Sequence, residues 1–360
     1  MSIATDNGGC LHHINLARVY RGGERQTEIL IRGLAERLPR QRLITRRGMP
    51  LHERLLGTDG VEVVPVDGRL EALKATHGAV LLHAHETRSA QVGFMRHMLS
   101  GTPYLITRRV DNRPRRDPLT RAMYRRAERV VVLSRAIGAV LTEVEPRARL
   151  QRIPSVSSGY SSDESWARAY RESLGADFLV GQVAALDQSH KGQLTLVGAA
   201  RELAARIPGV RFVFVGEGRD GGRIREAAAD LDNVSFTGWV ENVGDYLAAF
   251  DLFVLPSLRE GLGSILLDAM DFGLPVVASA VGGITDIVVD GETGVLVAPG
   301  DCHALAGAIL RLYRDAGLRN AMSEAARVRA MDYRPEIMIE RYLRLYDDIV
   351  PRLSRSADSP

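Results

Sequence analysis

Residues 259–283, REGLGSILLDAMDFGLPVVASAVGG, are expected to form a loop, a helix, a turn and a strand in close succession. The helix is predicted to begin near Ser264 and to end at Gly273, because glycine commonly follows a helix end. Glu260 and Asp268 stand with seven residues between them, one in the loop and one inside the helix. A carboxylate among leucines is costly unless it has a hydrogen-bond partner, so Asp268 predicts a polar partner or ligand.

The loop before this helix predicts an anion site. Unpaired backbone N–H groups at a helix start attract negative charge, and Gly261 and Gly263 let a ligand approach the backbone. With Leu262 and Ser264 they are predicted to bind a diphosphate, and Asp268, on the face of Ser264, would point toward the same ligand. The alternative is that both acids are ordinary residues near a helix start, where the helix dipole favours them.

Strands and helices alternate along the chain on both sides of this stretch. Short apolar runs such as AVLLHAH, RVVVLS and VRFVFVG are separated by helical segments, which favours an α/β fold with parallel sheets covered by helices. Pro, Ser and Gly cluster at 152–166, where we place an interdomain linker. The predicted domains are 1–155 and 156–335, followed by a helix at 336–350 and a flexible tail at 351–360. Two doubly wound domains in tandem form a cleft at the carboxyl ends of their strands, where ligands bind.

The composition is typical of a soluble globular protein. Of the 360 residues, 45% are hydrophobic and 25% are charged. A chain of this length is too long for one ordinary core, which suggests two domains. Cys10 and Cys302 lack the spacing of a metal site or a disulfide framework. The first residues do not read as a secretory signal, and no apolar run approaches the ~20 residues of a membrane-spanning helix. We therefore expect a soluble or peripheral protein.

The two halves of the chain differ in charge. Residues 1–155 carry 27 Lys and Arg against 15 Asp and Glu, whereas the remainder carries 20 against 29. A basic N-terminal half suits a phosphorylated acceptor, an anionic membrane or a nucleic acid. The aromatic and basic interleaving of a base-stacking surface does not appear, which argues against nucleic acid. Solvated arginines on helix faces explain the excess equally well.

The acids lie in a wider pattern, with S-x-x-E-G-x-G before the helix and G-x-P-V-V-A-S-x-x-G-G after it. In this context the sequence resembles the family 4 glycosyltransferases of the GT-B fold, most strongly over residues 213–299. The resemblance implies two Rossmann-like domains facing across a cleft, with the C-terminal helix returning to the N-terminal domain. Residues 1–155 would bind the acceptor and 156–335 the nucleotide sugar. Glu260 would contact the transferred sugar, and Asp268, where the family has glutamate, would bind the ribose hydroxyls.

A lysine in SHKG matches the family's phosphate-binding segment. The resemblance implies that Lys191 neutralises the leaving diphosphate, as a point charge before a helix can do. The family's arginine six residues earlier is replaced here by Ala185. Either His190 or an arginine from elsewhere takes its place, or the phosphate is held more weakly. The alternative for Lys191 is an ordinary surface lysine.

Two further segments match the family's donor site. The resemblance implies that the glycine turn at Gly216 lines the donor cleft and that Trp239 and Val240 lie beside the nucleobase. The spacing of Gly216, Gly218 and Gly221 also fits a dinucleotide-binding fingerprint, which is a weak signal on its own. The alternative for Trp239 is a core aromatic.

In the N-terminal half, Gly22 and Gly23 are expected between the first strand and the first helix. The resemblance implies that they approach the donor phosphates or the acceptor. His83 and His85 in HAHE would point to the same side of a strand end. We predict that His85 contacts the acceptor or the donor sugar. No third ligand stands nearby in sequence, so we expect no metal there.

The strand of TPYLITRRVDN ends in a histidine in the family. Arg108 and Arg109 stand in its place here, with Asp111 after them. Together with the basic segment that follows, they predict a cationic site for a phosphorylated or acidic acceptor. The alternative is a packing and solubility feature of a basic subfamily.

These observations predict a retaining glycosyltransferase. It would move a hexose-type sugar from a nucleoside diphosphate, expected to be UDP, to a hydroxyl of a glycan or lipid-linked glycan, in lipopolysaccharide or other cell-surface polysaccharide assembly. No metal or other cofactor is expected. The enzyme would be cytoplasmic, with peripheral association at the inner face of the membrane. The alternatives are a nucleotide-sugar epimerase of the same fold and a non-catalytic sugar-nucleotide-binding protein, in which Ala185 and Arg108 mark lost chemistry.

Overall fold

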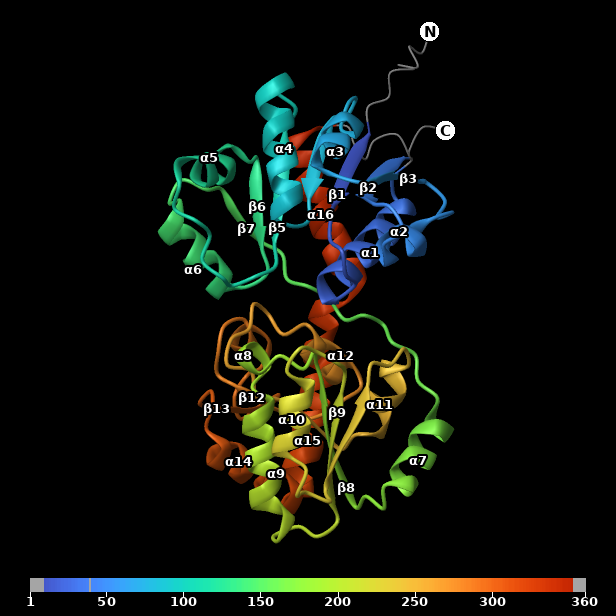
Figure 1. Ribbon diagram of the computed structural model, residues 1–360, viewed down its shortest axis with the longest axis vertical. Coiled ribbons are helices and arrows are strands. Elements are labelled where there is room, and N and C mark those ends of the chain that lie inside the picture. Colours follow the sequence, from blue (N-terminus) through green and yellow to red (C-terminus); the bar gives the residue numbers. More distant parts are fainter. Residues whose placement is uncertain (1–9, 39, 352–360) are drawn as a thin grey trace. The chain divides into compact units, whose positions relative to one another are not determined.

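The computed structural model describes residues 10–38 and 40–351 (Figure 1). The chain divides into two compact units. Unit 1 comprises Met1–Val156 and Pro335–Pro360, and unit 2 comprises Ser157–Arg334. Each unit contains one parallel sheet with helices packed against it, as the alternating pattern predicts.

Unit 1 has a seven-stranded sheet in the order β3-β2-β1-β4-β5-β6-β7. The strand order reverses between β1 and β4, which makes this a doubly wound sheet with a switch point there. Its strands are β1 (Leu11–Asn15), β2 (Gln41–Arg46), β3 (Val61–Val66), β4 (Leu81–Ala84), β5 (Tyr104–Arg108), β6 (Arg129–Val132) and β7 (Leu150–Arg152). Its helices are α1 (Gly22–Ala35), α2 (Pro50–Leu55), α3 (Arg69–Ala75), α4 (Thr87–Ser100), α5 (Pro118–Arg126), α6 (Arg135–Val144) and α16 (Pro335–Ile349).

The last helix, α16, completes the core of unit 1. Its apolar residues recur at helical spacing, so one face buries Met338, Tyr342 and Tyr346. This face packs against α1 and the strands, in one cluster that includes Leu11, Leu30, Leu34, Leu81, Leu105 and Val131. At Gly33 of α1 an added Cβ would lie 2.0 Å from Ile339, so the two helices touch at a glycine. The predicted return of the C-terminal helix to the N-terminal domain is confirmed.

Unit 2 has a six-stranded sheet in the order β10-β9-β8-β11-β12-β13, which reverses between β8 and β11. Its strands are β8 (Phe178–Val183), β9 (Val210–Val215), β10 (Val234–Gly238), β11 (Leu252–Leu255), β12 (Val276–Ser279) and β13 (Gly294–Val297). Its helices are α7 (Glu164–Ser173), α8 (Gln188–Lys191), α9 (Gln193–Ala204), α10 (Gly221–Ala227), α11 (Val243–Ala249), α12 (Ile265–Asp271), α13 (Ile284–Ile287), α14 (Cys302–Arg314) and α15 (Ala316–Ala330), and a 3-10 turn follows at Met331–Tyr333.

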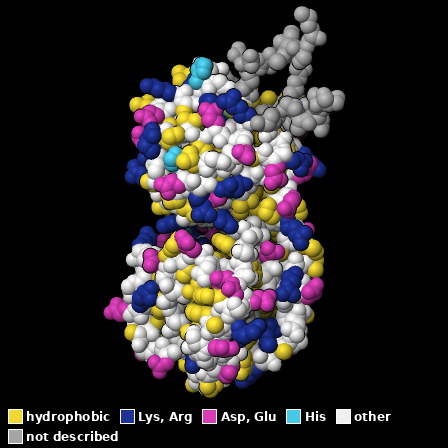
Figure 2. Space-filling view, turned by 90° about the vertical axis from the view of Figure 1, so that its right-hand side faces the viewer, with side chains coloured by type: hydrophobic (Ala, Val, Ile, Leu, Met, Phe, Trp, Pro, Cys, Tyr) yellow, Lys and Arg dark blue, Asp and Glu magenta, His cyan; other side chains and the backbone are white. Residues whose placement is uncertain are grey.

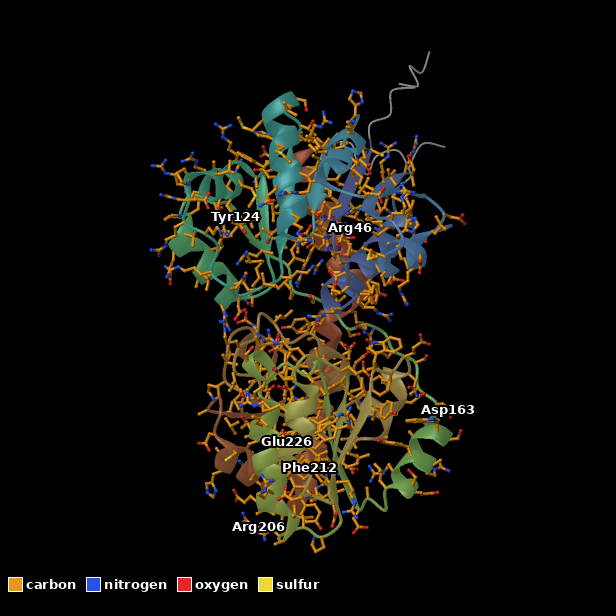
Figure 3. All side chains as sticks on the ribbon, in the orientation of Figure 1. Arg46, Tyr124, Asp163, Arg206, Phe212 and Glu226 are labelled. Atoms are coloured by element: carbon orange, nitrogen blue, oxygen red, sulfur yellow. The ribbon has the colours of Figure 1, made fainter. Side chains whose placement is uncertain are left out.

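The central strands β11 and β12 of unit 2 are buried on both faces, whereas β10 at the edge is only partly buried. All residues of β11 and β12 are buried, and Phe212 of β9 lies among the core side chains (Figure 3). Continuous apolar runs are the pattern expected of central parallel strands. The helix of the 259–283 stretch, α12, has Ser264 as its N-cap, and Gly273 follows it in the left-handed region at φ 71°. Both predicted ends therefore lie within two residues of the observed ones.

Within residues 10–38 and 40–351, no helix has the length and apolar character needed to cross a bilayer. On the face drawn in Figure 2, basic and acidic side chains are interspersed on each unit.

Candidate functional site

In unit 2, the loops after β8 and β11 meet where the strand order reverses. The N–H groups of Leu258 and Arg259 donate to the His190 carbonyl at 2.8 and 3.1 Å. Gly192 has φ +64°, and a Cβ added there would lie 2.0 Å from the Pro256 carbonyl oxygen. Only glycine allows this approach, which brings the ends of the two loops together. Open α/β sheets bind their ligands at such switch points.

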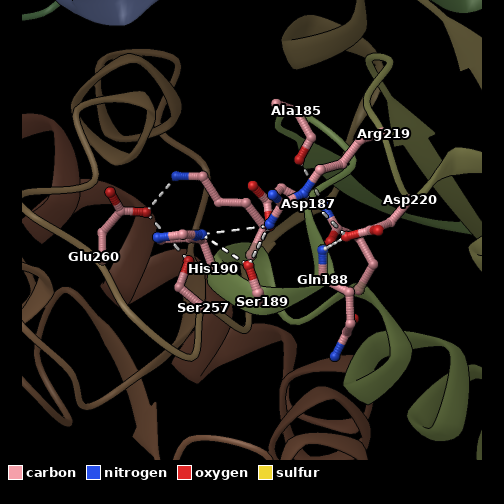
Figure 4. Close-up of polar contacts among 11 residues, drawn as sticks. Ala185, Asp187, Gln188, Ser189, His190, Arg219, Asp220, Ser257 and Glu260 are labelled. Atoms are coloured by element: carbon pink, nitrogen blue, oxygen red, sulfur yellow. Dashed lines mark hydrogen bonds and ion pairs between the residues drawn. The ribbon is translucent and has the colours of Figure 1, made fainter. Parts of the chain in front are cut away.

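This approach brings Lys191 and Glu260 into contact (Figure 4). The Lys191 ammonium donates to Glu260 Oε2 at 2.5 Å, and the Ser257 hydroxyl donates to the same oxygen at 3.2 Å. The side chains of Lys191 and Glu260 are 24% and 12% exposed, so the pair is largely shielded from water. The sequence singled out these two residues for separate reasons, and the fold joins them. The contact uses one of the three N–H donors of the lysine.

The two glycines after β12 hold the backbone of Glu260. The N–H of Gly283 donates to the Glu260 carbonyl at 3.1 Å. Gly282 has φ +56°, and a Cβ there would lie 1.8 Å from that same oxygen. The G-G pair of the quoted stretch is therefore needed for close backbone approach to the acid.

Asp268 is buried in α12, with 3% of its surface exposed. Its carboxylate accepts a hydrogen bond from the Ser158 N–H at 2.5 Å and another from the Ser158 hydroxyl at 3.3 Å. The acid among the leucines thus has partners in the segment that enters unit 2, which satisfies its charge within the protein. Binding of ribose by Asp268 remains a prediction.

The loop before α12 offers its backbone groups, rather than its side chains, to a ligand. Gly263 has φ +83°, which favours glycine, and the Leu262 side chain is buried. Ser264 caps the helix without a side-chain hydrogen bond. Leu262 therefore has only its backbone to offer a ligand, and with Gly261 and Gly263 the loop presents backbone rather than side chains.

An arginine that the sequence did not single out lies beside the lysine loop. Arg219 follows β9, and its guanidinium donates to Asp187 Oδ1 at 2.9 Å and to the Ser189 hydroxyl at 2.7 Å (Figure 4). Burial opposes ionisation of Asp187, but hydrogen bonds from Ser189, His190 and Arg219 lower its pKa to about 2. Arg219 is thus a candidate for the arginine expected from elsewhere in place of Ala185. Its signal was present in the sequence, inside the glycine-rich GEGRDG turn.

The other predicted donor residues lie on β9, β10 and the loops that follow them. Gly216 has φ +130°, and a Cβ there would lie 2.2 Å from the Ala184 carbonyl. Trp239 follows β10 and is 66% exposed, so the core-aromatic alternative is wrong. Val240 beside it is half-buried. The ring of Trp239 is open to solvent, and its contact with a base remains a prediction.

In unit 1, Gly22 and Gly23 are the first two residues of α1. The expectation that they belong to the loop before the helix was wrong, because the first helical turn begins one residue after Arg21. The carbonyl of Gly23 accepts a hydrogen bond from the Thr27 hydroxyl at 3.1 Å, and Asn15 at the end of β1 donates to that hydroxyl at 3.3 Å. The glycine turn is therefore tied to the carboxyl end of the first strand.

Three histidines lie together under α16. His13 of β1 is in register with His83 of β4, and His85 follows two residues later on the same face. One ring nitrogen of each lies within 4.8 Å of one ring nitrogen of the others. No third ligand stands nearby in the sequence, but strand pairing brings His13 to the pair from a distant part of the chain. Both nitrogens of His83 already have hydroxyl partners at 2.7 Å, on Tyr346 and Thr107, which makes this a hydrogen-bond network.

The network fixes the tautomer of His85. The amide of Gln41 donates to the Ile31 carbonyl at 2.9 Å, so its oxygen accepts from His13 Nε2 at 3.1 Å. Neutral His13 then accepts at Nδ1 from His85 Nε2, 3.0 Å away. His85 Nδ1 is left as an acceptor, and it is buried with no hydrogen-bond partner among residues 10–38 and 40–351. Burial lowers the pKa of His13 to about 3 and places those of His83 and His85 well below their usual range, so all three are neutral.

The two arginines at the end of β5 have different surroundings. Arg108 is 5% exposed, and its guanidinium donates to the Tyr124 hydroxyl at 3.0 Å and to Asn112 Oδ1 at 3.1 Å. Tyr124 belongs to α5 and is labelled in Figure 3. Arg108 therefore links the end of β5 to α5 and to the following loop by hydrogen bonds, rather than facing a ligand. Arg109 points to the other face, toward α1, and Asp111 is half-buried in the loop that follows.

Comparison with known proteins finds glycosyltransferases similar to this chain. A family model described as glycosyl transferases group 1 matches residues 177–315. A lipopolysaccharide core biosynthesis glycosyltransferase, LpsE of Rhizobium meliloti, is 33% identical over 159 residues, 43% of this chain and 46% of that one. The match thus spans about half of that relative. A D-inositol 3-phosphate glycosyltransferase of Acidothermus cellulolyticus is 30% identical over 78% of this chain and 69% of its own length.

Solved structures agree on the fold. The Anabaena protein Alr3699/HepE, crystallised with UDP and glucose, matches with a TM-score of 0.82 at 19% identity, over 95% of this chain and 100% of that one. A sucrose-phosphate synthase from Thermosynechococcus elongatus matches with a TM-score of 0.77 at 23% identity, over 95% and 99%. The two-domain architecture expected from the resemblance is therefore confirmed.

The contact between the two loops can be tested by Gly192→Ala. We expect the free energy of unfolding of unit 2 to fall by about 2 kcal/mol or more, since the new Cβ meets a carbonyl and the backbone is left-handed. Gly175→Ala is the control, because Gly175 has φ +56° with open space around it and should cost only about 1 kcal/mol. Urea unfolding followed by tryptophan fluorescence reports unit 2, which contains both tryptophans. Equal losses in the two variants would contradict the close approach.

The neutral histidines predict a pH dependence of unit 1. Between pH 6.5 and about 3 the unfolded chain binds a proton at His13 that the folded core excludes, and the lowered pKa values of His83 and His85 act in the same direction. Stability is therefore full above pH 6.5 and falls as the pH is lowered, by up to about 1.4 kcal/mol per pH unit for each such histidine. His13→Gln should make the dependence shallower in urea unfolding followed by circular dichroism at pH 7, 6 and 5. The exposed His77→Gln is the control and should leave the slope unchanged.

Proposed function

This chain belongs to the group 1 glycosyltransferases, and from that premise we propose that it transfers a hexose-type sugar from a UDP-linked donor to a hydroxyl of a glycan or lipid-linked glycan. The observation that carries the proposal is the contact of Lys191 with Glu260 at the switch point of unit 2. A cation and an acid joined there suit a ligand with both a phosphate and sugar hydroxyls. The choice of UDP is supported by the Anabaena neighbour, whose crystals contained UDP and glucose.

In the proposed mechanism Lys191 neutralises the leaving diphosphate. The bond from the anomeric carbon to the phosphate oxygen breaks, and negative charge develops on the leaving group, where a fixed ammonium is most useful. Glu260 accepts hydrogen bonds from the sugar and holds the ammonium in place. The carboxylate and the phosphate compete for Lys191, and its remaining N–H donors allow it to serve both. Arg219, beside the same loop, is our candidate for a second phosphate contact.

The stereochemistry and the nucleotide contacts are also part of the proposal. We expect retention of configuration, with the acceptor oxygen bonding to the anomeric carbon on the face that the phosphate leaves. The leaving phosphate takes the proton of the acceptor hydroxyl. Asp268 would receive the ribose hydroxyls in exchange for Ser158, and the exposed ring of Trp239 would lie beside the base. We expect these contacts to operate without a metal, because lysine, arginine and backbone N–H groups supply the positive charge.

The acceptor is proposed from the charge of the N-terminal half. Relatives are named for acceptors as different as D-inositol 3-phosphate and 2-deoxystreptamine, and one for lipopolysaccharide core biosynthesis. We propose a cell-surface glycan, because the basic N-terminal half suits an anionic acceptor or membrane. The alternatives differ in outcome: an epimerase would change the donor sugar with no acceptor present, and a non-catalytic protein would bind the donor without product.

A surface on unit 1 supports peripheral association with an anionic membrane. It combines exposed apolar side chains with exposed arginines that form no ion pair within the described chain. These residues lie on α4, on α5 and in the loop between β5 and α5: Met98, Leu99, Arg115, Arg116, Leu119, Arg125 and Arg126. Apolar groups that insert and arginines that meet lipid phosphates are the two parts of an interfacial anchor. We propose that this basic apolar surface meets the inner face of the cytoplasmic membrane.

The donor site is tested by calorimetric titration of UDP with EDTA present, together with a donor-turnover assay. Lys191→Gln should weaken UDP binding by roughly 10-fold or more and slow transfer by on the order of 10²-fold, since one charge-assisted contact is lost. Glu260→Gln should slow transfer with a smaller effect on UDP. Lys74→Gln, which alters an exposed lysine on α3, is the control. Unchanged affinity in Lys191→Gln, or a strict metal requirement, would contradict the assignment.

The membrane proposal is tested by flotation with vesicles of phosphatidylglycerol and phosphatidylcholine. The full chain should float with the anionic vesicles, and the variant Leu119→Ser with Arg125→Ser and Arg126→Ser should lose most of this binding. Each arginine near an anionic surface contributes about 1 kcal/mol, or roughly 5-fold in affinity. Arg201→Ser with Arg206→Ser, which removes two partly exposed charges from unit 2, is the control. Equal flotation of both variants would refute the surface.

A further inference from the structure

Residues 157–163, here called the linker segment, lie along α12 and α11 of unit 2. At the beginning of the segment, the Ser157 hydroxyl donates to Asp271 Oδ2, in the last turn of α12, at 3.2 Å. At its end, the Asp163 N–H donates to Asp245 Oδ1, in the first turn of α11, at 2.6 Å. The linker segment is therefore held on unit 2 at both of its ends by hydrogen bonds.

Between these ends, Ser158 occupies the carboxylate of Asp268. Its N–H donates to Oδ1 at 2.5 Å and its hydroxyl donates to Oδ2 at 3.3 Å, so each carboxylate oxygen accepts a hydrogen bond from the same residue. Only 3% of Asp268 is exposed. Because so little of its surface is left, a ligand hydroxyl reaches this carboxylate only when Ser158 withdraws.

The two donor groups of Ser158 imitate the diol of a ribose. The backbone nitrogen and the Oγ of a serine are the same number of bonds apart as the 2′ and 3′ oxygens of ribose, and both pairs carry hydrogens that a carboxylate can accept. Asp268 is also shorter than the glutamate usual in the family, and Ser158 fills the space that a longer side chain would take. Ser158 is thus placed as a ligand would be.

The backbone beside Ser158 is suited to movement. Gly159 is exposed, has φ +61° and has open space where a Cβ would be, so the chain bends there without packing against a neighbour. The tight contact of the linker segment lies beyond this bend, where a Cβ at Gly244 would lie 1.9 Å from the Ser161 carbonyl oxygen. Withdrawal of Ser158 therefore costs its hydrogen bonds to Asp268 and leaves the close approach at Gly244 in place.

We propose that Ser158 is an internal ligand of Asp268, which the ribose of a nucleotide must displace. The inference rests on the proposed function, in which Asp268 receives the ribose hydroxyls. In the free protein Ser158 satisfies a shielded carboxylate that would otherwise be costly. Donor binding exchanges these hydrogen bonds for those of the diol and releases the linker segment at Ser158 and Gly159. The apparent affinity for the nucleotide is lowered by the fraction of molecules in which Ser158 is bound.

Gly159→Ala tests this competition by calorimetric titration of UDP with EDTA present. Alanine disfavours the left-handed backbone of the bound segment, so UDP should bind roughly 5-fold more tightly. Ser158→Ala, which removes the hydroxyl contact, should also tighten UDP binding. Gly175→Ala is the matched control, because Gly175 of unit 2 has φ +56° and open space around it and should leave UDP affinity unchanged. Weaker or unchanged UDP binding in Gly159→Ala would overturn the proposal, since Ser158 would then support the site or have no effect on it.

Hydrogen exchange followed by mass spectrometry shows whether the linker segment is released. Saturating UDP should make the backbone amides around Ser158 exchange several-fold faster, because the Ser158 N–H loses its acceptor. The dideoxy analogue of UDP, which lacks both ribose hydroxyls, should leave their exchange unchanged at equal saturation. Slower exchange with UDP, or equal acceleration by the analogue, contradicts displacement by the diol.

These outcomes separate the proposal from the proposed function. If UDP binds with the same affinity in wild type and Gly159→Ala and leaves the exchange of the linker segment unchanged, the role of Ser158 is rejected and the donor site stands. If neither the wild type nor Gly159→Ala binds UDP, both proposals are rejected. If UDP binds to Gly159→Ala and only weakly to the wild type, the competition by Ser158 is supported.

Discussion

The close approach of Gly192 to the Pro256 carbonyl is the constraint on which the candidate site of unit 2 depends. Because no side chain fits between them, the loops after β8 and β11 touch, and Lys191 reaches Glu260. A similar close approach occurs in the loop after β12, where a Cβ added to Gly282 would meet the Glu260 carbonyl. Three loops from neighbouring strands are thus fixed by backbone contact. Side chains held in this way have little freedom to lose when a ligand binds, which is the advantage of a preorganised site.

The sequence was sufficient for the fold and for the components of this site. Alternating strands and helices, the paired acids and the glycine turns all predict a doubly wound donor domain, and the helix ends lie close to their expected positions. These features are local, so a single stretch of sequence contains them. The prediction that α16 returns to unit 1 came instead from the family resemblance, because the sequence of an amphipathic helix does not show which surface the helix packs against.

What the sequence missed comes from contacts between distant segments. His13 joins the His-x-His pair only through strand register, Arg219 reaches the lysine loop from the next strand, and Ser158 reaches Asp268 across 110 positions. No spacing rule encodes such pairs. The different roles of Arg108 and Arg109 are another matter, because alternation along a strand already places them on opposite faces. Strand geometry alone would therefore have predicted different surroundings for the two arginines.

The cations at the two switch points have different kinds of partner. In unit 2 the cations near the proposed phosphate are neutralised within the protein, Lys191 by Glu260 and Arg219 by Asp187, so a ligand must compete with partners already present. In unit 1 the three core histidines are neutral, and the contacts of Arg108 and Arg109 within the described chain are to Tyr124, Asn112 and Thr27 rather than to a carboxylate. Neutral histidines beside a cation fit this arrangement, since protonated ones would repel it. Ligand binding in unit 2 should consequently exchange one partner of each cation for another, whereas the two arginines of unit 1 have no carboxylate in the described chain to release.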